Sequence, residues 1–140
     1  MKNVVGIREG NDKQLKGEFV VIGAHYDHVG LGHFGSRRGE GKVHNGADDN
    51  ASGVSVLLEV AEALKEAHLK RSVVVIAFDG EEKGLLGSRT YTEASSFDAT
   101  KIIAMLNVDM IGRNETKTIN LGIPGPESSL VNGVLKKAEL

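Results

Sequence analysis

Three solidly apolar runs, at residues 19–24, 73–78 and 102–108, predict buried strands. Runs of this length without polar alternation are typical of parallel strands that are covered on both faces. A shorter apolar run at 4–7 precedes a polar turn and predicts an edge strand. One further strand is expected at 118–121. The apolar pattern therefore predicts a sheet whose central strands are buried.

Between these runs the spacing of apolar residues changes to that of helices. Residues 52–69 form the clearest case, with Val54, Leu57, Leu58, Ala61 and Leu64 on one face. Asn50 or Ser52 is expected to cap this helix. Further helices are expected at about 84–96 and from 127 onward. Strands that alternate with helices predict an α/β fold, a three-layer sandwich around a mostly parallel central sheet.

Length and composition limit the possible functions. A chain of 140 residues, with 17 basic and 19 acidic side chains, suits a single domain over 1–140 without the basic face of a nucleic-acid binder. There is no cysteine, which excludes disulfides and thiolate metal sites. No apolar stretch reaches the roughly 18 residues of a membrane span, and the start does not resemble a signal peptide. We expect a soluble chain and leave its compartment open, a secreted or periplasmic parent included.

The segment from 28 to 50 is rich in glycine and predicts a long loop, which in a compact domain is often functional. Within it, residues 30–35 match the dinucleotide-binding pattern G-x-G-x-x-G. That pattern works only when its last glycine opens a helix that faces the pyrophosphate. Here the residues that follow carry more glycines and no helical period, so nucleotide binding is not expected.

Four polar blocks hold the candidate site residues, and three of them lie where a predicted strand ends: His25 and Asp27, Asp48 and Asp49, Glu81 and Glu82, and Asp109. In open α/β sheets, ligands bind just outside the carboxyl ends of the strands. Histidine with several carboxylates is a ligand set for zinc or a similar divalent ion. The blocks therefore predict a metal site at one edge of the sheet.

The residues within each block suggest a division of roles. Asp27 is placed to hold the second ring nitrogen of His25, as carboxylates often do beside metal-binding histidines. His28 is a weaker candidate and is expected to be a loop residue. One of the two adjacent aspartates would bind metal, bridging two ions if the site is dinuclear, while the other is structural. One of the two adjacent glutamates would bind metal and the other act as a general base.

Four motifs in this order, VIGAHYDHVG, NGADDNASGV, FDGEEKGLLGS and LNVDMIGR, resemble the catalytic domain of dinuclear zinc exopeptidases of the bacterial leucyl aminopeptidase and glutamate carboxypeptidase type. The resemblance runs from about residue 3 to 113. It implies an exopeptidase, most simply an aminopeptidase, in which a metal-bound hydroxide attacks the peptide carbonyl. The partner would be a peptide substrate, and the cofactor two zinc ions.

The resemblance also implies a role for each site residue. The metal ligands would be His25 and Asp109 on one zinc and Glu82 on the other, with Asp48 bridging both. The catalytic residues would be Glu81, as general base, and Asp27, which orients His25. The resemblance further implies a cis peptide bond at the position of 48–49.

One departure from the family is expected to matter. Its last zinc ligand is a histidine in the C-terminal part of the domain, and no histidine follows Asp109 here. The last predicted helix also lacks a terminator before Leu140, so we expect the domain to be incomplete at its C-terminal side. The alternative hypothesis is therefore a catalytically incomplete metal-binding fragment, which could form a homo-oligomer through an exposed sheet edge or pair with a missing C-terminal half.

Overall fold

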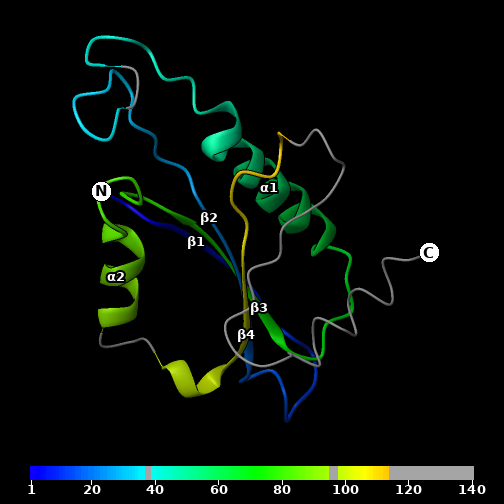
Figure 1. Cartoon of the computed structure of the whole chain (residues 1–140). Helices are drawn as coiled ribbons and strands as arrows, with labels where there is room; N and C mark the ends of the chain where they lie inside the picture. Colours follow the sequence, from blue (N-terminus) through cyan, green and yellow to red (C-terminus); the bar gives the residue numbers. More distant parts are fainter. Residues whose placement is uncertain (37–38, 95–97, 114–140) are drawn as a thin grey trace, which may run out of the picture.

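The computed structural model describes residues 1–36, 39–94 and 98–113 (Figure 1). Four strands form one sheet in the spatial order β1-β3-β2-β4. Their bounds are Val4–Arg8 for β1, Phe19–His25 for β2, Ser72–Phe78 for β3 and Ile102–Asn107 for β4. All four predicted strands in the described part of the chain are thus confirmed, and each differs by at most one residue at either end.

The register of the sheet brings three strand ends together. β2 runs parallel to β3, with His25 opposite Phe78, and parallel to β4, with Gly23 opposite Asn107. β1 pairs with the outer side of β3 in the antiparallel direction, as an edge strand. The sheet is therefore mixed and mostly parallel. The carboxyl ends of β2, β3 and β4 meet at one edge, where the polar blocks were predicted to lie.

Helices cover both sides of the sheet, so the predicted three-layer arrangement is confirmed. Helix α1 (Gly53–Ala63) and helix α2 (Leu86–Glu93) lie on opposite sides of the strands in Figure 1. A kinked helical turn, η1 (Ala47–Ser52), precedes α1, and a short 3-10 turn, η2 (Ala99–Lys101), leads into β4.

Helix α1 ends six residues before the predicted boundary at 69. The side chain of Arg8 donates hydrogen bonds to the carbonyl groups of Leu64 and Lys65, at 3.2 and 3.3 Å. The carbonyl of Leu69 accepts a hydrogen bond from the backbone N–H of Asn11 at 2.8 Å. Because β1 and the turn after it satisfy these carbonyls, the chain leaves the helix there without losing hydrogen bonds.

One cluster of buried apolar residues lies between the sheet and α2. Val21, Val74, Ile76 and Phe78 are buried together, and Tyr91 of α2 meets the ring of Phe78 edge-on at a centroid distance of 6.3 Å.

The strand expected at 118–121 and the helix expected from 127 lie outside the described residues. Within the described part, no helix is long and apolar enough to cross a membrane.

Candidate metal centre

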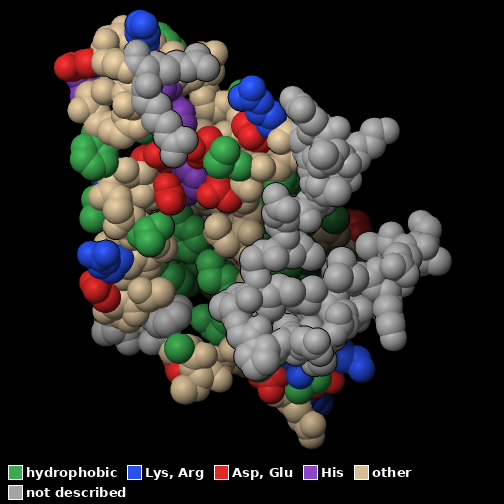
Figure 2. Space-filling view, in the orientation of Figure 1, with side chains coloured by type: hydrophobic (Ala, Val, Ile, Leu, Met, Phe, Trp, Pro, Cys, Tyr) green, Lys and Arg blue, Asp and Glu red, His purple; other side chains and the backbone are tan. Residues whose placement is uncertain are grey.

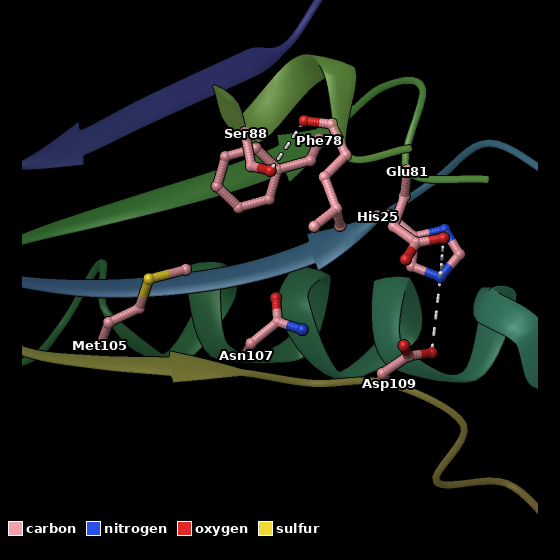
Figure 3. Close-up of a pocket in the computed structure, with 8 residues that line it drawn as sticks. His25, Phe78, Glu81, Ser88, Met105, Asn107 and Asp109 are labelled. Carbon is pink, nitrogen blue, oxygen red and sulfur yellow. Dashed lines mark hydrogen bonds and ion pairs between the residues drawn. The ribbon is translucent and has the colours of Figure 1, made fainter. Parts of the chain in front are cut away.

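His25 is the centre of one group of potential metal ligands. It is the last residue of β2, and its side chain is only 3% exposed. Its Nε2 atom lies 3.1 Å from Oδ1 of Asp49 and 3.4 Å from Oδ1 of Asp109, two residues beyond the end of β4. Figure 3 shows Asp109 pointing toward the imidazole ring across the ends of the two strands. The structure therefore brings together side chains that are 84 residues apart in the chain.

The spacing of this group fits a tetrahedral zinc ion. With metal–ligand bonds of 2.0–2.2 Å, tetrahedral ligand atoms lie about 3.3–3.6 Å apart. The two distances from His25 Nε2 are close to that separation. The other ring nitrogen, Nδ1, lies 3.1 Å from the backbone carbonyl of Asp27. Donation from Nδ1 to this carbonyl leaves the lone pair of Nε2 directed at the two carboxylates.

A second group forms around His28. Its Nδ1 atom lies 2.5 Å from Oε1 of Glu82 and 4.0 Å from Oδ2 of Asp49. Asp49 thus belongs to both groups, with one carboxylate oxygen turned to each histidine. His28 was expected to be a loop residue and a weaker candidate; it does lie in the loop after β2, and its side chain is beside the predicted ligand Glu82. In the space-filling view, histidine and acidic side chains gather in one region of the surface (Figure 2).

The position of the two aspartates requires a correction. The structure places Asp49, not Asp48, between the two histidines. Oδ1 of Asp48 instead accepts hydrogen bonds from the backbone N–H of Gly112 at 2.8 Å and from Ser52 Oγ at 3.3 Å. The physical reason is the kink in η1, where Asp49 leaves the helical conformation with φ −104° and ψ 92°.

The expected cis peptide bond is also displaced by one residue. The structure has it between Asp49 and Asn50 rather than at the predicted position 48–49. The predicted cis bond was therefore one residue too early in the chain. Asp48 likewise precedes by one residue the aspartate that lies between the two histidines.

Asp27 does more than was expected of it. Its carboxylate lies 3.7 Å from Nδ1 of His25, a longer contact than that made by its own carbonyl. Its two oxygens instead accept the backbone N–H groups of Glu81 at 2.9 Å and Glu82 at 3.2 Å. Asp27 therefore connects the end of β2 to the loop after β3 and fixes the backbone from which both glutamates project.

Asn50 is a residue of the site that the sequence pattern did not identify beyond a capping role. Its side chain is buried, donates from Nδ2 to the carbonyl of Val108 at 3.0 Å, and accepts at Oδ1 from the N–H of Gly53 at 3.0 Å. Oδ1 also accepts from the N–H of Met110 at 3.3 Å. These contacts cap α1 and hold the segments that carry Asp49 and Asp109 against each other.

The electrostatic environment follows from the packing of carboxylates around one imidazole. Burial by itself would lower the pKa of His25, but the negative charges of Asp109, Glu81 and Asp49 together raise that pKa above its ordinary value. Burial raises the pKa of Glu81, and the neighbouring carboxylates raise it further, against the opposing effect of His25. The raised pKa values reflect an excess of negative charge at this site, which a bound divalent cation would neutralise.

A cavity of about 180 Å³ opens beside this group. Figure 3 shows Glu81 and Asp109 at one end of it and Phe78 and Met105 further along the strands. Leu85 completes the apolar part. No Lys or Arg is among the described residues that line the cavity. The metal-ligand groups therefore border a space with both acidic and apolar walls.

Comparison with known proteins agrees with this arrangement. The family described as Peptidase family M28 matches residues 3–139. The aminopeptidase YwaD of Bacillus subtilis (strain 168) is 34% identical over 122 residues, which cover 86% of this chain and 24% of that protein. The chain thus spans about a quarter of the length of this relative.

Solved structures give the same result. The structure of BSAP, a zinc aminopeptidase from Bacillus subtilis, is 36% identical, with a TM-score of 0.63, over 79% of this chain and 24% of that one. The aminopeptidase from Aneurinibacillus sp. strain AM-1 is 30% identical, with a TM-score of 0.63, over 77% of this chain and 24% of that one. The sheet and its flanking helices therefore match part of the fold of these two structures.

Proposed function

Because the chain belongs to peptidase family M28, we propose that it forms the metal-binding core of a zinc aminopeptidase. The observation that carries the proposal is the shared carboxylate of Asp49, which turns one oxygen to His25 and the other to His28. A carboxylate placed between two ligand groups is the arrangement that two metal ions about 3.5–4 Å apart require. Bound zinc would polarise the peptide carbonyl and lower the pKa of water.

Residues of this chain suit the binding of the two metal ions, the proton transfer and the positioning of the general base. His25, Asp49 and Asp109 would hold one zinc, and Glu82 with Asp49 would hold the other. Glu81 would accept the proton of the attacking water and pass it to the leaving amine. Its raised pKa suits a group that must both take up and release a proton. Asp27 would keep Glu81 in position through its hydrogen bond to the backbone N–H of that residue.

The walls of the cavity favour an amino terminus over a carboxyl terminus in the substrate. No Lys or Arg is among the described residues that line the cavity, so none of them would pair with a substrate carboxylate. Phe78, Leu85 and Met105 would receive an apolar side chain. An aminopeptidase that acts on peptides with an apolar first residue fits this arrangement best.

The test uses a chromogenic aminoacyl substrate, the chain and added zinc. Glu81→Gln should lower turnover at least about 100-fold, since a general base contributes 10²–10⁴-fold, while zinc binding is retained. Glu59→Gln, on the exposed surface of α1, is the matched control and should keep full turnover. Zinc binding without turnover in the unmutated chain would contradict the proposal and favour a non-catalytic metal-binding module instead.

A further inference from the structure

We propose that Asn3 is a positioning residue for the two glutamates of the site, because its side chain joins the two ends of the loop that carries them. This glutamate loop runs from Asp79, just after β3, to Gly87, in the first turn of α2, with Glu81 and Glu82 between these ends. The inference rests on the proposed function and adds to it a residue that lies outside the four polar blocks of the sequence.

One side-chain amide binds both ends of the glutamate loop. Oδ1 of Asn3 accepts the backbone N–H of Asp79 at 3.1 Å, and Nδ2 of Asn3 donates to the backbone carbonyl of Gly87 at 2.9 Å. A backbone N–H needs an acceptor and a carbonyl needs a donor, and the amide of asparagine supplies one of each. The end of β3 and the start of α2 are therefore held together by a single side chain.

The antiparallel direction of β1 brings Asn3 to this loop. β1 begins beside the carboxyl end of β3, with Val4 opposite Ala77, so the residue before β1 lies at the edge of the sheet where the metal-ligand groups are. Figure 1 shows the start of the chain beside the first turn of α2. A parallel strand in the same place would have its amino end at the opposite edge of the sheet, far from the glutamates.

The two ends of the glutamate loop approach too closely for a side chain at Gly87. A Cβ atom on Gly87 would overlap the carbonyl oxygen of Asp79 and Oδ1 of Asn3. Gly87 is buried and is not among the glycines with positive φ, so its lack of a side chain serves close packing here. Asn3 therefore takes part in a tightly packed junction at the base of the loop.

Within the glutamate loop, backbone hydrogen bonds make a compact unit. The N–H groups of Gly84 and Leu85 both donate to the carbonyl of Glu81 at 2.9 Å. The N–H of Leu86 donates to the carbonyl of Gly80 at 3.0 Å. Because the loop is closed internally, a change at its two ends would move the glutamates together relative to the other proposed metal ligands.

Asp27 and Asn3 hold the glutamate loop at different places. The carboxylate of Asp27 accepts the N–H groups of Glu81 and Glu82, at 2.9 and 3.2 Å, and so binds the middle of the loop to the end of β2. Asn3 binds the two ends from the side of β1. Without Asn3, the start of α2 could move away from the end of β3 while the contact to Asp27 pulled on the middle of the loop.

Arg8, at the opposite end of β1, provides a matched comparison. Its side chain also makes two hydrogen bonds to backbone groups far away in the chain, the carbonyls of Leu64 and Lys65, at 3.2 and 3.3 Å. Arg8 lies opposite Val73, at the start of β3, so these contacts are made at the other edge of the sheet. A variant of Arg8 therefore loses similar contacts of the same strand without touching the glutamate loop.

The first experiment measures hydrogen exchange in the metal-free chain, for Asn3→Ala, Asn3→Asp and Arg8→Ala. Asn3→Ala loses both contacts, whereas Asn3→Asp keeps an acceptor for the N–H and has no donor for the carbonyl. Both Asn3 variants should speed the exchange of the N–H groups of Glu81 and Glu82 at least about tenfold, since local opening of the loop exposes them. Arg8→Ala should leave these two exchange rates unchanged.

The second experiment measures Co²⁺ binding by visible absorption, and turnover of a chromogenic aminoacyl substrate with added zinc. Because Glu82 is a proposed ligand, the Asn3 variants should alter the cobalt spectrum and weaken binding about 10–100-fold, the loss typical of residues that hold a ligand in place. The kcat should fall by a similar factor with little change in KM, since Glu81 would act in the transition state. Arg8→Ala should change neither the spectrum nor kcat.

The outcomes separate this inference from the proposed function. Folded Asn3 variants with unchanged exchange at the two glutamates, or with the cobalt spectrum and affinity of the unmutated chain, would overturn the role of Asn3. Equal effects in Arg8→Ala would also overturn it, because they would show a general loss of stability. If circular dichroism shows that Asn3→Ala is unfolded, Asn3→Asp decides in the same way, and unfolding of both would assign Asn3 to the fold as a whole and overturn the inference. Absence of metal binding or turnover in the unmutated chain would contradict the proposed function, while the exchange rates of the metal-free chain would still decide the role of Asn3.

Discussion

The side chain of Asn50 binds the backbone of Val108, with Nδ2 donating to the carbonyl oxygen at 3.0 Å. This contact joins residues 58 positions apart, one beside the shared Asp49 and the other beside Asp109. Because the amide oxygen of Asn50 also accepts the N–H of Gly53 and of Met110, one buried side chain connects the start of α1 to the segment after β4. The separation of Asp49 and Asp109, the two aspartates proposed to bind the same metal ion, therefore depends on Asn50.

Asn50→Ala should destabilise the chain and weaken zinc binding together. Removing one partner of buried hydrogen bonds costs about 1–3 kcal/mol, and the freed segments would no longer hold Asp49 and Asp109 in register. Urea unfolding of the metal-free chain and a zinc titration measure the two effects. Asn11→Ala, at an exposed position, is the control and should change neither. A variant that loses stability but binds zinc normally would contradict the positioning role.

Gly53→Ala should destabilise the same junction by steric overlap. A Cβ atom on Gly53 would lie 2.4 Å from Oδ1 of Asn50 and 2.5 Å from the carbonyl oxygen of Val108. Its φ of −66° is ordinary for a helix, so alanine would cause crowding and no backbone strain. Overpacking of this kind costs about 1–3 kcal/mol. Gly6→Ala, where a Cβ meets nothing within 4 Å, should leave the unfolding midpoint nearly unchanged.

The apolar runs predicted the sheet well because burial on both faces leaves a signal in each strand separately. They also placed His25 and Asp109 correctly at strand ends. The apolar pattern does not distinguish Asp48 from Asp49. Which of them faces the histidines depends on the kink at Asp49 and Asn50, and the Asn50 side chain is bound to Val108, far away in the chain. The contact between His28 and Glu82 was not predicted either, because the two residues are 54 positions apart and only the fold brings them together.

The pKa of Asp79 should lie below its ordinary value of 3.8, because its carboxylate accepts the backbone N–H of Lys2 at 2.7 Å. The charge of the N-terminal amino group, 3.9 Å away, acts in the same direction, and the partial desolvation of the carboxylate acts against both. A depressed pKa in the folded state means that the stabilising contact is present above pH 3.8. It is lost as the pH falls through the lower, folded-state value.

Carboxyl NMR of Asp79 between pH 2 and 6 measures this pKa. Asp79 belongs to neither metal-ligand group, so metal binding does not enter the measurement directly. Lys2→Pro removes the donated N–H and should return the pKa toward 3.8, whereas Lys2→Ala keeps the N–H and should preserve the shift. If both variants gave the same pKa as the unmutated chain, the backbone hydrogen bond would not be its cause.

Asp49→Asn should weaken metal binding far more than Asp48→Asn, although the two residues are adjacent and chemically identical. Asp49 offers one oxygen to each ligand group, so its amide should abolish tight binding at both. Among the described residues, the carboxylate of Asp48 accepts the N–H of Gly112 and the hydroxyl of Ser52, contacts that an amide oxygen can still accept. Its variant should therefore bind zinc with less than a tenfold loss of affinity. A zinc titration of both variants side by side decides the assignment, and equal losses would contradict it.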